Sequence, residues 1–122
     1  MSRSEREKGR KGEAEVAAVY RRRGLTVRGL EGSGDHLIVC DPASNFVIHS
    51  EVKRQETARP WAWWEQASSE APDGTVPVVA FRRNRSPWLA MIELERLAEL
   101  LELAAIAQAE LRTYRGEDEA SG

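Results

Sequence analysis

Residues 46–53 of the chain read Phe-Val-Ile-His-Ser-Glu-Val-Lys. The aromatic and branched residues at the start of this stretch predict a β-strand, in which successive side chains point to opposite faces of the sheet. His49, Glu51 and Lys53 therefore share one face of the predicted strand. Three consecutive polar positions on one face, in a chain whose other strands look buried, indicate a functional site.

A second carboxylate lies nearby in the predicted sheet. Asp35 ends the glycine-rich turn Gly32-Ser33-Gly34 and directly precedes an apolar run at 36–40, which predicts another strand. Taken alone, Glu51 and Lys53 could be solvated residues of an edge strand, and Asp35 could be a turn former after glycine. Together with Lys53 they predict a site for a hard cation with an ammonium group beside it. Such a site suits metal-assisted hydrolysis of a phosphodiester.

A third carboxylate is predicted on a helix. Residues 8–23 have helical periodicity, and Glu13 aligns with an apolar stripe at i+3, i+4 and i+7 (Val16, Ala17 and Tyr20). A carboxylate at the head of a buried stripe needs a partner, and metal-bound water is one candidate. Glu13 could equally be an ordinary acidic residue of a first helical turn. Glu15 competes for the same role.

The pattern of the whole chain predicts an α/β fold with a mixed central sheet and the order αβββαββα. The first three strands, at 25–30, 36–40 and 46–53, are expected to form an antiparallel meander. A helix beginning at Pro60 is expected to end before Pro72. Its Trp61 and Trp64 are predicted to lie in the core. Trp63 is expected either to stack on an exposed base or to pack against the last helix. Strands at 76–81 and 88–92 and a helix at 93–112 complete the order.

At 122 residues one domain is expected. The predicted division is a flexible N-terminus at 1–7, the main domain at 8–92, a C-terminal helix at 93–112 and a disordered tail at 113–122. No apolar stretch approaches the ~18 residues of a membrane span, and the charged N-terminus does not resemble a secretory signal. A cytoplasmic protein is the expectation, in the host cytoplasm if a phage encodes it.

The net charge of −2 is unevenly distributed. Residues 1–92 carry fifteen Lys and Arg against twelve Asp and Glu, whereas the rest carries three against eight. A basic body with an acidic tail is compatible with a polyanionic substrate. The candidate contacts to DNA phosphates are Arg10, Lys11, Arg54, Arg82, Arg83 and Arg85.

Several stretches are similar to those of one family. The chain resembles the archaeal and phage Holliday-junction resolvases of the PD-(D/E)XK nuclease superfamily, over roughly residues 8–92. The matching stretches are Lys8–Val16, Gly32–Asp35, Glu51–Lys53, Trp64–Ala67, Pro77–Phe81 and Pro87–Leu89. One departure is Gly34, where the superfamily name has proline. Another is a second Lys-Gly pair, which leaves the choice between Glu13 and Glu15 open.

The resemblance implies a restriction-endonuclease-like fold and assigns roles to five residues. Asp35 and Glu51 would be metal ligands and Lys53 the catalytic lysine. Glu13 would support the metal-water shell, and Gln66 would steady the site. Mg²⁺ is the expected cofactor, with Mn²⁺ as a possible substitute.

The expected function is a Mg²⁺-dependent, structure-selective endodeoxyribonuclease that resolves four-way DNA junctions by paired nicks. A homodimer is expected, joined through the strand at 88–92 or through an apolar seam of the last helix. One alternative is another PD-(D/E)XK nuclease of repair or restriction type. The other is a catalytically inactive DNA-binding module of the same fold, which would not need to retain Asp35, Glu51 and Lys53 together.

Overall fold

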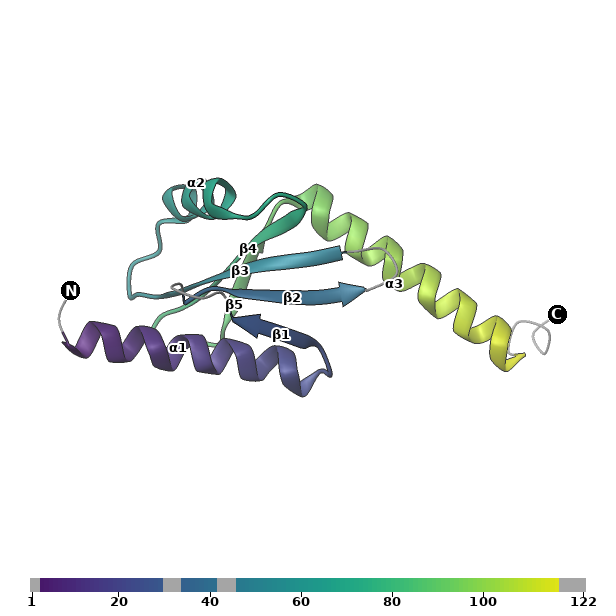
Figure 1. Cartoon of the computed structure of the whole chain (residues 1–122), viewed down its shortest axis with the longest axis horizontal. Helices are drawn as coiled ribbons and strands as arrows, with labels where there is room; N and C mark the ends of the chain where they lie inside the picture. Colours follow the sequence, from purple (N-terminus) through teal and green to yellow (C-terminus); the bar gives the residue numbers. More distant parts are fainter. Residues whose placement is uncertain (1–2, 30–33, 42–45, 117–122) are drawn as a thin grey trace. The chain divides into compact units, whose positions relative to one another are not determined.

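The computed structural model describes residues 3–29, 34–41 and 46–116, and their order αβββαββα confirms the predicted fold class (Figure 1). Most of the expected glycine-rich turn, Gly32-Ser33, lies outside the described residues, as do residues 42–45 and the segment 117–122 of the expected disordered tail. The elements are α1 (Arg3–Arg22), β1 (Thr26–Gly29), β2 (His36–Asp41), β3 (Phe46–Arg54), α2 (Pro60–Glu70), β4 (Thr75–Arg82), β5 (Leu89–Ile92) and α3 (Leu94–Arg115).

The five strands form one mixed sheet in the order β1-β2-β3-β4-β5. β1, β2 and β3 are antiparallel neighbours, which confirms the predicted meander. β3 and β4 are parallel, because α2 connects them and returns the chain to the same end of the sheet. β5 then runs antiparallel to β4. The strand that carries Glu51 is therefore central, with a neighbour on each side.

One helix covers each face of the sheet, as Figure 1 shows for α1 and α2. α1 packs on the face that bears Val52, and the buried Gly12 allows the close approach: a Cβ there would lie 3.5 Å from the Val52 side chain. α2 packs on the opposite face, where Trp63 and Ala67 form a buried cluster with Val79 of β4. The alternation of side chains along β3 thus directs Glu51 and Lys53 towards the α2 face.

The prediction that Trp61 lies in the core was wrong. Trp63 is buried, 5 % exposed, and its ring centroid lies 5.5 Å from that of Phe81. Trp61 is 79 % exposed and Trp64 is half-buried. The buried face of α2 is set by the pair at i and i+4, Trp63 and Ala67, so Trp63 is not available to stack on a base.

The helix boundaries also differ from those expected. α1 begins at Arg3, within the segment expected to be flexible, and α3 continues to Arg115, where Gly116 adopts a left-handed conformation (φ 75°) and ends it. The chain divides into two compact units, Met1–Ile92 and Glu93–Gly122. In the second unit the α3 side chains of Leu94 and Leu101 are 76 % and 61 % exposed. Among the described helices, none combines the length and apolar character needed to cross a bilayer.

Candidate active site

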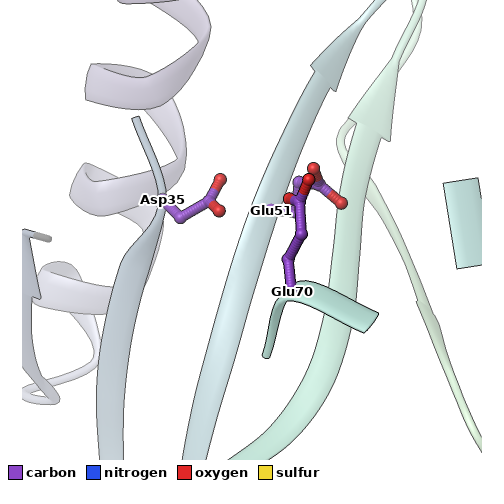
Figure 2. Close-up of side chains that lie close together, drawn as sticks. All are labelled: Asp35, Glu51 and Glu70. Carbon is purple, nitrogen blue, oxygen red and sulfur yellow. The ribbon is translucent and has the colours of Figure 1, made fainter. Parts of the chain in front are cut away.

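The register of the sheet brings the two predicted carboxylates together. His36 pairs with Ser50 across β2 and β3, so the next step places Asp35 beside Glu51. Figure 2 shows that Glu70, at the end of α2, joins them. One carboxylate oxygen from each of the three lies within 4.8 Å of the other two. Asp35 and Glu51 meet as predicted, and Glu70 is a member that the sequence analysis missed.

Glu51 is the most perturbed carboxylate of this cluster. It is 5 % exposed, and burial raises its pKa to about 7. The Lys53 ammonium opposes this rise in the pKa, whereas the charges of Asp35 and Glu70 add to it. A central strand thus holds a carboxylic acid that ionises near neutrality, beside two further carboxylates.

The donor set fits a divalent cation. Glu51 Oε2 is buried and has no hydrogen-bond partner among the described residues. A buried carboxylate oxygen without a partner is costly, and clustered carboxylates repel one another. A hard cation coordinated by oxygen would satisfy that oxygen and relieve the repulsion between the three carboxylates.

Lys53 is held at the edge of the carboxylate cluster by α2. Its Nζ donates a hydrogen bond of 2.8 Å to Gln66 Oε1 and lies 3.7 Å from Glu51 Oε1. Gln66 Nε2 donates in turn to Glu70 Oε1, one helical turn further along α2, at 3.3 Å. Gln66 therefore links the lysine to the carboxylate that the sequence analysis missed, and it fixes the position of the ammonium group.

His49 lies beneath Asp35. The imidazole is 2 % exposed, and its Nε2 lies 3.3 Å from Asp35 Oδ2. The prediction of a polar face at positions 49, 51 and 53 is therefore confirmed, with His49 packed in the interior. A buried imidazole against one oxygen of Asp35 restricts the rotation of that carboxylate.

The structure separates the two candidate acids of α1. Glu13 lies against Gly34, where a Cβ would collide with the Glu13 carboxylate, so the glycine at this position allows the approach. Burial raises the pKa of Glu13, and the nearby Asp35 adds to the rise. Glu15 instead accepts a hydrogen bond of 2.8 Å from the Trp88 indole and lies 3.3 Å from Arg82 Nη1. Of the two acids, Glu13 is the one beside the site.

The candidate DNA contacts fall into two groups. Arg10 and Arg54 line a groove that also reaches Glu13 and Lys53, while Lys11 is exposed elsewhere on α1. Arg82 is held by Glu15 and lies over the Trp88 ring, 5.7 Å from its centroid. The last two predicted contacts, Arg83 and Arg85, are exposed in the turn between β4 and β5.

The raised pKa of Glu51 predicts how the stability of the metal-free protein depends on pH. The folded state favours protonated Glu51, so this contribution to the free energy of unfolding is fully present below 4.5 and is lost as the pH rises to about 7. The Glu51→Gln variant lacks this contribution. The free energies of unfolding of both proteins are measured in urea with EDTA across this pH range. As the pH rises, the wild type should lose stability relative to the variant. Parallel pH profiles would contradict the assignment.

The fold and the site together define a class of protein. A mixed sheet with a helix on each face, carrying paired carboxylates and a lysine on its inner strands, is the arrangement of the PD-(D/E)XK nucleases. Residues 4–120 match the family described as "Phage putative PDDEXK endonuclease", and the chain belongs to that family. Neither the curated proteins nor the solved structures include a match to this chain.

Proposed function

We propose that the chain is a Mg²⁺-dependent DNA endonuclease whose centre is the cluster of Asp35, Glu51 and Glu70. The observation that carries this proposal is the buried, unpartnered oxygen of Glu51 among three converging carboxylates, with Lys53 beside it. An inactive DNA-binding module would gain nothing from such an arrangement, because it costs folding free energy in the absence of a cation. Family membership supports the nuclease activity.

Asp35 and Glu51 would hold the cation, and the exposed Glu70 would support it at the rim of the site. When bound, a divalent ion would supply Lewis-acid stabilisation of phosphoryl charge and would lower the pKa of water, so that hydroxide is available to attack a phosphodiester in line. Lys53, positioned by Gln66, faces the same space and neutralises negative charge that develops on the phosphate. Glu13 can accept a hydrogen bond from a water molecule next to Asp35, and His49 keeps Asp35 in place.

The finer proposal is that the substrate is a four-way junction, cut by two symmetric nicks. It rests on the resemblance of the sequence to junction resolvases. Two symmetric nicks call for two active sites in a fixed relation, which a two-fold homodimer provides. β5 is an edge strand of the sheet with Leu89 53 % exposed, and α3 carries exposed leucines, so each offers a self-complementary surface. We favour the β5 edge, because the resemblance reaches it.

A comparison of substrates tests this function. A four-way junction, a duplex and a single strand of matched sequence are incubated side by side with Mg²⁺ and with EDTA. We expect cleavage only with the metal, and the junction to be cut fastest. No cleavage of any substrate, with metal binding intact, would contradict the nuclease. Equal cleavage of the junction and the duplex would contradict junction specificity and would favour a PD-(D/E)XK nuclease of repair or restriction type.

Two further experiments test the homodimer and the paired nicks. We expect sedimentation at about twice the chain mass. A plasmid with an extruded cruciform should appear as linear product without passing through free nicked circles, because both nicks fall within one binding event. A monomer that releases only nicked circles would contradict paired cleavage.

A further inference from the structure

A groove of about 1290 Å³ runs along the first half of α1 and reaches Glu13 and Lys53, which lie beside the carboxylate site. Its two walls are α1 and the end of β3 with the loop that follows. Three acids, Glu5, Glu13 and Glu56, line it. The six basic residues that line it are Arg3, Arg6, Lys8, Arg10, Lys53 and Arg54. The groove thus has an excess of three positive charges in a chain whose net charge is −2.

The chemistry of this lining favours a phosphate backbone over bases. None of the described residues that line the groove is aromatic, so the bases of a strand find no stacking surface there. Arginine and lysine side chains form contacts with phosphates that position a strand without reading its sequence. Since Glu13 and Lys53 belong both to the groove and to the active site, a strand lying in the groove would pass two residues that border the carboxylate cluster.

One position in the groove is built for an anion. Arg54 is 14 % exposed, and its Nη2 donates to Asn84 Oδ1 at 2.8 Å, which fixes the guanidinium plane. Its Nη1 is buried and has no hydrogen-bond partner among the described residues. A buried donor on a fixed guanidinium is suited to a bidentate or charge-assisted bond with a phosphate oxygen.

Glu56 lies next to this position. Its Oε1 accepts a hydrogen bond of 3.0 Å from the backbone N–H of Asn84. The same oxygen is 3.7 Å from Lys8 Nζ and 3.8 Å from Arg54 Nη1, which are ion-pair distances too long for hydrogen bonds. One carboxylate oxygen therefore faces donors from α1, from β3 and from the turn after β4. The Glu56 side chain is 51 % exposed and can turn away into solvent.

We propose that the groove binds the DNA backbone on one side of the cleaved bond, and that Glu56 occupies the place of one phosphate in the DNA-free protein. This proposal rests on the proposed nuclease function for its ligand. DNA binding then displaces the Glu56 carboxylate from Lys8 and Arg54. Glu56 is thereby an intramolecular competitor that weakens binding to DNA.

The first test is Glu56→Gln, which removes the competing charge and keeps the shape. Binding of a fluorescein-labelled DNA duplex is titrated in EDTA, so that cleavage does not interfere, over a series of salt concentrations. We expect an affinity gain on the order of tenfold at about 0.1 M salt. The log–log slope should be steeper than in the wild type, because salt weakens the Glu56 ion pairs that DNA has to break only in the wild type. Glu65→Gln, the same change at an exposed position of α2, is the matched control. A gain no larger than that of the control would overturn the role of Glu56.

The second test removes the basic wall. The variant Arg3→Ala/Arg6→Ala/Arg10→Ala is compared with Arg21→Ala/Arg22→Ala/Arg23→Ala, an equal loss of charge at the other end of the same helix. We expect the first variant to lower the affinity and to make the slope shallower by up to about three units. The second variant should change both much less. Equal effects of the two triple variants would overturn the groove, and thermal unfolding confirms that both are folded.

A double-mutant cycle separates competition from a structural role. If Glu56 and a phosphate compete for Lys8, then Lys8→Ala should reduce DNA affinity more in the Glu56→Gln background than in the wild type. Equal losses in both backgrounds would overturn the competition.

Inorganic phosphate, compared with chloride at the same ionic strength, shows whether a free phosphate anion can occupy the position of Glu56. We expect that it cannot compete with DNA, and that the connected DNA backbone is required for binding. If neither the wild type nor any variant cleaves DNA, but the variants change DNA affinity as expected, the nuclease function is contradicted and the groove remains assigned as a DNA-binding site.

Discussion

Glu51→Gln is expected to reduce DNA cleavage on the order of a thousandfold. A bound divalent ion contributes several kcal/mol to stabilising the transition state, and each 1.36 kcal/mol changes the rate about tenfold. Glu51 is the most buried carboxylate of the cluster, and its Oε2 has no hydrogen-bond partner among the described residues. The amide retains the shape of the side chain and loses the charge that binds a cation. Asp35→Asn should have an effect of similar size.

Three measurements distinguish this loss from misfolding. Above pH 7 the metal-free Glu51→Gln protein should be more stable than the wild type, because the variant removes a buried carboxylate whose pKa of about 7 reflects unfavourable ionisation. Its melting temperature should also respond little to Mg²⁺, whereas that of the wild type should rise. DNA affinity in EDTA should be unchanged or slightly higher. Full cleavage activity in Glu51→Gln or in Asp35→Asn would refute the site.

Glu70→Gln provides a graded comparison. Glu70 is exposed and belongs to α2, so the amide can remain hydrogen-bonded to Gln66. We expect a smaller loss of activity, about 10- to 100-fold, typical of a group that supports a metal site at its rim. An effect as large as that of Glu51→Gln would make Glu70 an equal ligand of the cation.

The parts of the site that lie on strands could be predicted from the sequence because their geometry is local. The period of two along 46–53 placed Glu51 and Lys53 on one face, and the meander required Asp35 to lie on the neighbouring strand. The structure agrees, since the register of β2 and β3 leads from the His36–Ser50 pair to Asp35 and Glu51. In an antiparallel pair, a correct strand prediction is nearly enough to predict which side chains meet.

The parts on helices were harder to predict because their phase depends on the sheet they pack against. Three tryptophans within four residues of α2 give no clear apolar stripe, and only Val79 and Phe81 select Trp63 for burial. Once that face is set, Gln66 and Glu70 point towards Lys53 and the cluster. The spacing of four between Gln66 and Glu70 was the available signal in the sequence, because such pairs share a helix face.

The choice between Glu13 and Glu15 could not be made from sequence for a related reason. Both lie near apolar residues of α1, and the periodicity allows either to face the sheet. The structure distinguishes them through Trp88 and Arg82, far away in the sequence, which bind Glu15. Gly34 makes room for Glu13 in the position where the superfamily name has proline. This departure from the superfamily pattern is therefore tied to the approach of Glu13 to Asp35.

Lys53→Ala is expected to lower cleavage about 100- to 1000-fold while metal binding persists, because the ammonium stabilises charge on the phosphate and is not a ligand of the cation. Lys53→Arg should recover little, since the planar guanidinium cannot reproduce a single donor held 2.8 Å from Gln66 Oε1.

The readout that separates the role of Lys53 from that of the carboxylates is the pH at which Mg²⁺ begins to raise the melting temperature. Lys53 lowers the pKa of Glu51, so the loss of Lys53 should move this onset to higher pH. If Lys53 acted only by repelling the cation, its loss would strengthen Mg²⁺ binding and move the onset to lower pH. Gln66→Ala, which frees the lysine without removing it, should reduce cleavage less and leave the onset nearly in place. A Lys53→Ala protein that cleaves normally, or one that no longer responds to Mg²⁺ at any pH, would contradict the separation of roles between the lysine and the carboxylates.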